Sequence, residues 1–413
     1  MLMAEKKGRT DRITLIVFLL CLAGYTVLMY RLFYLQALHC GIRDIYISDI
    51  KAYLQTILGL ESGYDFPYPI YFALGKFFLL FTNVAVAGAL AAALLNSLGV
   101  VVLFCYMRKF LKDYGKGTAF GEYAGFAALF LSFSMFFISM LYLPGNLYLP
   151  GMGHKYLGTF TPNPYHNITY MATRPFATLA FFLYVRILDY YEERTDVKEF
   201  VLFGASLLLT TMTKPSYTLV LVSTAGLLMV WRLFKRRWKN FRRSLYLGFA
   251  FVPTFIDLLY QFGGVFGKNS LVGDEGGIGF GIASVWKLYT ANIPCSVALA
   301  LGFPLLVLLF HTGEIRKNTL YRFSWAQMAV SAGEFFGLYE KGYRFADANF
   351  SWGYMHGLFF MFVASLLVLS KDTMKKSANR CVLCLQWLLY GAHLICGAAY
   401  FLYVWRGNPY HMF

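Results

Sequence analysis

Long apolar stretches recur from one end of the chain to the other, separated by polar segments. Most are about 17–25 residues long, which is enough for an α-helix to cross a hydrocarbon core of about 30 Å. Inside these stretches polar residues do not alternate with apolar ones, as the strands of a membrane barrel would require. Because a backbone in lipid must satisfy its own hydrogen bonds, helices are the remaining solution. The pattern predicts an all-α polytopic membrane protein.

We expect about eleven transmembrane helices, each of roughly the length that a bilayer requires. They are expected at residues 13–34, 84–106, 123–141, 168–190, 199–213, 216–234, 244–260, 294–310, 323–339, 352–370 and 381–404. Together they would form a single transmembrane domain over residues 1–413, with no separate soluble domain.

The composition also indicates a membrane protein, because 58% of the residues are hydrophobic and only 14% are charged. A soluble globular protein carries roughly 25% charged residues. The net charge of +16 raises the alternative of nucleic-acid binding. However, Lys and Arg gather in every second segment between the apolar stretches, which is the distribution that sets membrane topology. We therefore expect a cytoplasmic N-terminus, a C-terminus outside and no nucleic-acid partner.

The polar segments on the two sides differ in length as well as in charge. Those assigned to the inside are short and basic, whereas the outer ones are longer and rich in aromatic residues, Gly, Pro, His and Asp. The outer loops cover 36–83, 142–167, 261–293 and 340–351. Function is commonly carried by loops that a rigid scaffold holds. We therefore place the chemistry on the outer side.

The first outer loop is expected to hold two helices at the membrane surface. Ser48 or Asp49 is positioned to cap a short helix whose apolar residues recur at helical spacing and form one face. Pro67 and Pro69 then interrupt the chain. The apolar stretch 70–81 that follows is too short to span a bilayer, so it predicts a second interfacial or re-entrant helix.

Two short motifs resemble sequences of the GT-C glycosyltransferases, a superfamily that includes the protein O-mannosyltransferases and related bacterial enzymes. One is Tyr-Pro-Ile-Tyr-Phe-Ala-Leu-Gly-Lys at 68–76, and the other is Thr-Lys-Pro-Ser at 213–216. The order of elements is similar too, with a first membrane helix followed by a long outer loop that holds an early acidic residue. The resemblance covers roughly the N-terminal half of the chain. Where the family has a paired Asp-Glu, this chain has Asp49 followed by Ile50.

The resemblance implies transfer of a sugar from a polyprenyl-phosphate carrier to a glycan, lipid or protein acceptor, at the outer face of a bacterial plasma membrane. Such a transfer needs a base that deprotonates the acceptor hydroxyl while the lipid phosphate leaves. Asp49 is the best-placed carboxylate, with Asp44 and Asp65 as reserves. The alternative role for Asp49 is to cap the helix that follows it.

The leaving lipid phosphate needs cations or amide donors around it. Arg174 lies just inside the outer end of an expected membrane helix, where a charge is costly and is therefore a functional candidate. The alternative for Arg174 is a side chain that extends to the interface. Lys214, before Pro215 at the outer end of another helix, is a second candidate. Lys341 and Arg344 in the outer loop 340–351 are further candidates, and the alternative for both is a solvated position. We expect Asp49 and Arg174 to face one outer cavity.

Polar side chains near the outer face are candidates for binding the sugar. Asn163 and His166 end the second outer loop, directly before the next expected membrane helix, and Tyr46 and Asp65 lie in the first outer loop. His356, just below the outer surface, is a further candidate, and packing among aromatic rings is its alternative role.

No residue pattern defines a metal site, and a divalent cation is left open as a cofactor. The seven cysteines are scattered along the chain. Cys381 and Cys384 have CxxC spacing, but neither a second pair nor a nearby group of histidines completes a zinc site. We expect no structural disulfide framework.

Two other functions fit parts of the sequence. An envelope polysaccharide polymerase or ligase would use the same lipid carrier, but it would favour a large late outer loop rich in Arg and His. A transporter or a lipid-linked glycan flippase would place charges near the middle of its helices. This chain has few charged residues at such positions, and Glu334 and Asp257 are the exceptions.

Overall fold

A computed structural model describes residues 2–42, 45–142, 161–266, 277–290, 292–375 and 377–409 of the chain. The reserve acid Asp44 and most of the expected second outer loop at 142–167 therefore lie outside the described residues.

Helices dominate the described ranges. In chain order they are α1 (Leu2–Leu38), α2 (Ile50–Leu58), α3 (Ile70–Leu79), α4 (Val84–Tyr114), the 3₁₀ turn η1 (Ala119–Glu122), α5 (Ala124–Ser134), α6 (Ile168–Tyr190), α7 (Val197–Thr213), α8 (Ser216–Lys235), α9 (Phe241–Phe249), α10 (Val252–Phe266), α11 (Trp286–Tyr289), α12 (Ile293–Phe310), α13 (Glu314–Lys317), α14 (Thr319–Gly337), the 3₁₀ turn η3 (Gly342–Asp347), α15 (Phe350–Thr373) and α16 (Arg380–Trp405).

Among the described residues, 7 helices are long and apolar enough to cross a membrane, or 8 if the bent pair α9 and α10 is one span. The seven are α1, α4, α6, α8, α12, α15 and α16. These helices make the chain a multi-pass, all-α membrane protein. They do not support the expected count of about eleven, which treated every apolar stretch as a full crossing.

The missing spans fall short for identifiable reasons. Helix α5 has 11 residues, which corresponds to about 16 Å of helix against a core of about 30 Å. Helix α7 has 17 residues, which corresponds to about 26 Å. Helix α14 has 19 residues but carries Arg322, Gln327 and Glu334, so its hydropathy is low. The stretch expected at 244–260 is divided between α9 and α10, which meet at an angle of 50°.

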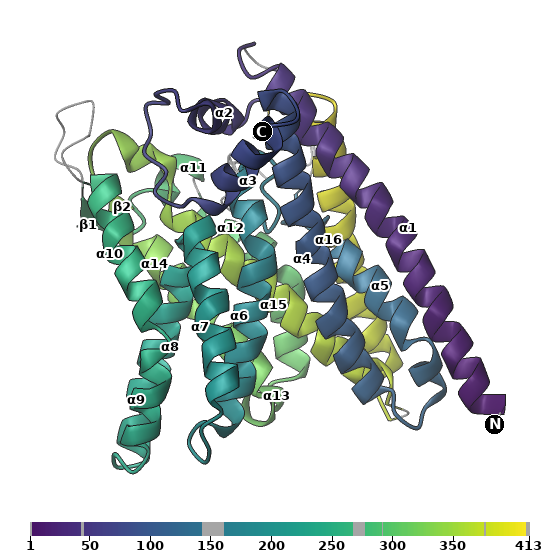
Figure 1. Cartoon of the computed structure of the whole chain (residues 1–413). Coiled ribbons are helices and arrows are strands. Elements are labelled where there is room, and N and C mark those ends of the chain that lie inside the picture. Colours follow the sequence, from purple (N-terminus) through teal and green to yellow (C-terminus); the bar gives the residue numbers. More distant parts are fainter. Residues whose placement is uncertain are drawn as a thin grey trace.

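The two described ends of the chain lie at opposite ends of the helix bundle, as Figure 1 shows. Helices α2, α3 and α11 lie at the same end as the C-terminus, and α9 and α13 lie at the other end with the N-terminus. The first outer loop touches the end of α16, because the backbone N–H of Tyr46 donates to the carbonyl of Gly407 at 2.8 Å. We refer to these as the α2 end and the α9 end.

The α9 end holds basic side chains in ion pairs. Asp11 of α1 accepts from Lys112 at 2.7 Å and from Arg108 at 3.1 Å, both on α4. Near the start of α9, Glu192 pairs with Arg236 at 2.8 Å. These side chains come from the segments that the charge pattern assigned to the inside.

Helix α15 lies at the centre of the bundle. Every side chain from Ser351 to Ser370 is buried, so α15 is surrounded by other helices on all its faces. It packs against α4, α8, α12 and α14. Helix α1 is peripheral and packs mainly on α4, leaving Leu20 and Val27 exposed.

Both helices expected in the first outer loop are present. Helix α2 buries Ile50, Tyr53, Leu54 and Ile57 of the apolar face that its spacing predicted. Leu58, which the same spacing placed on that face, is 47% exposed at the end of the helix. Helix α4 can approach it closely because a Cβ at Gly88 would lie 2.7 Å from Leu54 Cδ2. The absence of a side chain at Gly88 therefore gives Leu54 of α2 room to pack on α4.

The described residues contain one small antiparallel sheet, made of β1 (Ile278–Phe280) and β2 (Leu338–Glu340). Ile278 is opposite Glu340, and Phe280 is opposite Leu338. The strand pairing holds Glu340 and the following turn η3 at the α2 end, beside the start of α15.

Candidate functional site

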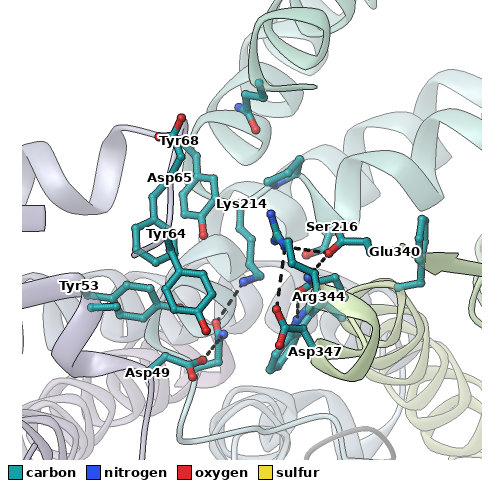
Figure 2. Close-up of a pocket in the computed structure, with 18 of the residues that line it drawn as sticks. Asp49, Tyr53, Tyr64, Asp65, Tyr68, Lys214, Ser216, Glu340, Arg344 and Asp347 are labelled. Carbon is teal, nitrogen blue, oxygen red and sulfur yellow. Dashed lines mark hydrogen bonds and ion pairs between the residues drawn. The ribbon is translucent and has the colours of Figure 1, made fainter. Parts of the chain in front are cut away.

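A cavity of about 1100 Å³ lies at the α2 end of the bundle. Its lining comes from the first outer loop, the residues before α6, the break between α7 and α8, helix α10 and the β2–η3 segment. In Figure 2, Asp49 and tyrosines of the first outer loop form one side, and Glu340, Arg344 and Asp347 form the other, with Lys214 between them. The tertiary fold therefore brings charged groups from distant parts of the sequence to one space.

Asp49 is the N-terminal flanking residue of α2, as the sequence predicted, but its carboxylate is used differently. The hydroxyl of Ser48 accepts from the N–H of Ile50 at 3.4 Å, while the Asp49 carboxylate accepts from Asn167 Nδ2 at 2.7 Å. The Asp49 backbone donates to the carbonyl of His166 at 3.2 Å. Two contacts thus fix Asp49 against the segment before α6, and its carboxylate does not cap α2.

Burial raises the pKa of Asp49 to about 6, and the nearby Lys214 and the hydrogen bond from Asn167 offset part of that rise. A carboxylate with this pKa is ionised at neutral pH and is more basic than an exposed one. It therefore meets the requirement for a general base that works near neutrality.

Asn167 holds the centre of the site by capping α6. Its Oδ1 accepts from the N–H of Tyr170 at 2.9 Å and from the hydroxyl of Thr169 at 3.1 Å. The Nζ of Lys214 donates to the same oxygen at 3.4 Å. Because the oxygen is engaged by the helix, the amide nitrogen must face Asp49. Sequence reasoning missed this role, although an Asn before an apolar helical run is the signal of an N-cap.

Lys214 occupies the break between α7 and α8, just before Pro215. Its Nζ donates to Thr169 Oγ1 at 3.3 Å and lies 4.9 Å from the ring centre of Trp352. The side chain is 8% exposed. Burial lowers the pKa of Lys214 to about 8, and Asp49 offsets part of that change. The lysine remains a cation at neutral pH and borders the cavity.

Arg344 provides a second cation across the cavity. Its Nε is 2.9 Å from Glu340 Oε2 and 3.9 Å from Asp347 Oδ2. Asn349 donates to the same Glu340 oxygen at 2.7 Å and accepts from the indole of Trp352 at 3.1 Å. The sequence offered Arg344, with Lys341, as a further candidate cation for the phosphate, with a solvated loop position as the alternative. Its place in the site follows from the β1–β2 pairing and the η3 turn.

The opposite part of the cavity is apolar. Leu219 of α8 and Phe255, Leu258 and Leu259 of α10 line it. Leu259 is 74% exposed and Phe255 47%, so this wall continues onto the outer surface of α10. The cavity therefore joins a charged interior to an exposed apolar helix face.

Arg174 does not line this cavity, contrary to the expectation that it would share one with Asp49. Its side chain is 1% exposed, and its guanidinium donates to Asn163 Oδ1 at 2.7 Å and to the carbonyl of Pro162. It also lies 4.1 Å from the ring centre of Phe359. Two of its nitrogens thus donate to protein oxygens, and aromatic rings enclose the guanidinium away from the cavity.

Asn163 is likewise engaged by the fold. Its Nδ2 donates to the carbonyls of Met135 at 3.1 Å and Ile138 at 2.7 Å. These carbonyls follow the end of α5, where helical bonding stops. Asn163 and Arg174 together satisfy buried backbone where α5 ends and α6 approaches, which is a structural task.

Of the other candidate residues for binding the sugar, two line the cavity and two have structural contacts instead. His166 and Asp65 line the cavity. Tyr46 instead anchors the first outer loop, because its hydroxyl donates to the carbonyl of Trp405 at 3.1 Å. His356 is buried in the bundle with its ring 4.1 Å from that of Tyr170, which matches the packing role considered for it.

Within the described ranges, no three His, Cys, Asp or Glu side chains form a group that could hold a metal ion. The described lining of the cavity combines the carboxylates of Asp49, Glu61, Asp65, Glu340 and Asp347 with the cations of Lys51, Lys214 and Arg344, beside an apolar wall.

Neither a protein-family model nor a curated protein matches this chain. The geometry of the cavity is therefore the basis for assigning a function.

Proposed function

We propose that the protein is a GT-C-like glycosyltransferase, which moves a sugar from a polyprenyl-phosphate carrier to an acceptor at the outer face of a bacterial plasma membrane. The observation that supports this proposal most strongly is the joining of a charged cavity to an exposed apolar wall. A lipid-linked phosphate has the same two parts, a charged head and a long hydrocarbon tail. The tail would lie along Phe255 and Leu259, and the head would enter the cavity.

The proposed reaction uses the carboxylate of Asp49 and the cations of Lys214 and Arg344. Asp49 takes the proton of an acceptor hydroxyl, and the acceptor oxygen forms a bond to the anomeric carbon of the sugar. The bond between that carbon and the phosphate oxygen breaks, and the electron pair leaves with the lipid phosphate. Lys214 and Arg344 stabilise the charge that develops on this phosphate.

Arg344, which the sequence offered as a further cation for the phosphate, takes the role that was expected first of Arg174. Arg344 is paired with Glu340 and lies near Asp347, so its charge is already balanced. A bidentate phosphate contact is a strong interaction for a guanidinium. Donor binding would therefore draw Arg344 from Glu340 towards the phosphate.

The orientation in the membrane follows from the charge distribution. The segments that hold Arg108, Lys112 and Arg236 lie at the α9 end. Helix α2, whose N-terminal residues line the cavity, lies at the other end. The positive-inside rule then places the N-terminus and the α9 end in the cytoplasm, and the cavity and the C-terminus outside. The acceptor would be a glycan, lipid or protein of the envelope.

The enzyme class is tested with the purified full-length chain in lipid nanodiscs and polyprenyl-phosphate sugars labelled in the sugar. An enzyme of this class releases unglycosylated polyprenyl phosphate when an envelope extract supplies acceptors. A flippase would leave the bond between sugar and phosphate intact while moving the lipid. If the labelled sugar stays on the lipid with every donor and every extract, the proposal is wrong.

A further inference from the structure

Aromatic side chains form a short stack on the cavity wall that belongs to the first outer loop. The rings of Tyr64 and Phe66 stack with centres 6.0 Å apart and planes 22° apart. Phe66 in turn contacts Tyr68 at 5.8 Å and Phe72 at 5.4 Å. Tyr64 is 48% exposed and lines the cavity, whereas Tyr68 is 8% exposed. We call Tyr64, Phe66 and Tyr68 the Tyr64 platform.

The position of Tyr64 is set by a tight turn. Gly63 has a φ of 76°, a left-handed conformation that favours glycine. The Ser62 hydroxyl donates to the Tyr64 carbonyl at 2.9 Å and accepts from the Tyr64 N–H at 3.4 Å. The exposed ring is therefore held in place before any ligand binds, which lowers the entropic cost of using it for binding.

Polar groups surround this ring on the same side of the cavity. Glu61, Ser62 and Asp65 line the cavity next to Tyr64, and Lys51 lies on the same loop. Figure 2 shows Asp49 on this side as well, away from Arg344. The proposed base is therefore on the side of the Tyr64 platform, and the proposed phosphate ligands Lys214 and Arg344 are beside or opposite it.

This combination matches the surface of a sugar ring. One face of a pyranose presents C–H groups, which pack on the electron-rich face of an aromatic ring. Its edge presents hydroxyl groups, which donate to carboxylates such as Glu61 and Asp65. On this side of the described cavity Glu61 and Asp65 outnumber Lys51, the lysine of the first outer loop that lines it, and this balance disfavours an anionic ligand.

On the basis of the proposed transferase function, we propose that the Tyr64 platform is the acceptor subsite and that the acceptor is a neutral or amino saccharide. The sugar ring stacks on Tyr64, and one of its hydroxyl groups points to Asp49. The apolar wall on α10 stays available for the hydrocarbon tail of the donor.

Binding of soluble probes tests the subsite without any donor. The full-length chain in nanodiscs is titrated with chitotetraose, maltotetraose and a Ser- and Thr-containing peptide, and binding is followed by saturation-transfer NMR. We expect a saccharide to bind, and Tyr64→Ala to weaken it about tenfold, the upper range for an aromatic contact. Tyr64→Phe keeps the ring and is expected to bind within about threefold of the wild type.

Tyr123 supplies a matched control, because it is 59% exposed and lies before α5, away from the cavity lining. Tyr123→Ala should leave saccharide binding unchanged. The inference is overturned if neither saccharide binds, if Tyr64→Ala binds as well as the wild type, or if the peptide displaces the saccharide from the same site.

The outcome is separable from that of the proposed function, since saccharide binding needs no polyprenyl-phosphate sugar. The donor could be consumed with a peptide acceptor, without any effect of Tyr64→Ala. That result would support the transferase function and exclude the saccharide subsite. Saccharide binding that depends on Tyr64, without consumption of any donor, would support a saccharide site at the Tyr64 platform and exclude the transferase function.

Discussion

The amide nitrogen of Asn167 donates a hydrogen bond of 2.7 Å to the carboxylate of Asp49. The cap of α6 fixes this arrangement, because the amide oxygen is already occupied by the N–H of Tyr170. Lys214 donates to the same amide oxygen at 3.4 Å. A single side chain therefore connects the proposed base to the proposed phosphate ligand.

Asn167→Asp should move the acidic limb of the pH profile to higher pH. Aspartate caps a helix about as well as asparagine, but the variant places a carboxylate oxygen against Asp49 where a donor stood. A like charge at this distance raises the Asp49 pKa by about one unit or more. The measurement is kcat/KM against pH, with Asn167→Ser as a control that keeps a cap and loses the donor. An acidic limb that stays at the wild-type pH in Asn167→Asp would exclude Asp49 as the titrating base.

The wild-type protein should show a bell-shaped dependence of kcat/KM on pH. Asp49 must be ionised to accept a proton, and its pKa is about 6, so activity falls as pH decreases through that value. Lys214 must be protonated to hold a phosphate, and its pKa is about 8, so activity falls as pH increases through that value. A profile that stays flat between pH 5 and 9 would contradict both assignments.

Lys214→Met should weaken donor binding and remove the alkaline limb. The variant keeps an unbranched apolar stem near Trp352 but loses the charge. A charge-assisted hydrogen bond contributes about 1.5–3 kcal/mol, so KM for the donor should increase by at least tenfold. Lys116→Met is the control, because Lys116 is an exposed residue paired with Asp113. An unchanged donor KM and an unchanged alkaline limb in Lys214→Met would count against the phosphate role.

Arg174→Met should destabilise the fold with little effect on donor KM. The change leaves the buried oxygens of Asn163 and Pro162 without their cation, and hydrogen bonds to a charged group contribute about 1.5–3 kcal/mol each. We expect a lower midpoint of thermal unfolding in detergent or nanodiscs. The donor KM, measured on the folded fraction at low temperature, should stay near the wild-type value. A large increase in the donor KM at unchanged stability would instead support a role for Arg174 in binding the phosphate.

Local sequence signals identified the parts of the site that depend on local structure. The apolar spacing after Asp49 predicted α2 and its buried face, and the Lys214-Pro215 pair marked the break between α7 and α8. Both features arise within one or two helical turns, and they placed Asp49 and Lys214 at a loop-bearing end. The cluster of Arg344 and Glu340 was less visible, because it depends on a strand pairing with the distant residue Ile278.

The expectations that failed depended on tertiary contacts. The sequence gives the charge of Arg174 and its position along the helix, and both are the same whether the side chain faces a cavity or a carbonyl group. Its partners are set by where α5 ends, and the sequence indicated a longer helix there. The count of membrane spans failed for a related reason, because an apolar stretch such as 123–141 does not show where its helix stops.

The most direct test of the central claim is the rate of sugar transfer by Asp49→Asn in nanodiscs, at saturating polyprenyl-phosphate sugar and acceptor. Asparagine keeps the size of the side chain and cannot accept the proton, and general base catalysis contributes about 10²–10⁴-fold. We therefore predict a loss of at least a hundredfold in kcat, while Asp113→Asn, a carboxylate exposed at the end of α4, keeps the wild-type rate. Transfer by Asp49→Asn at the wild-type rate would contradict the account.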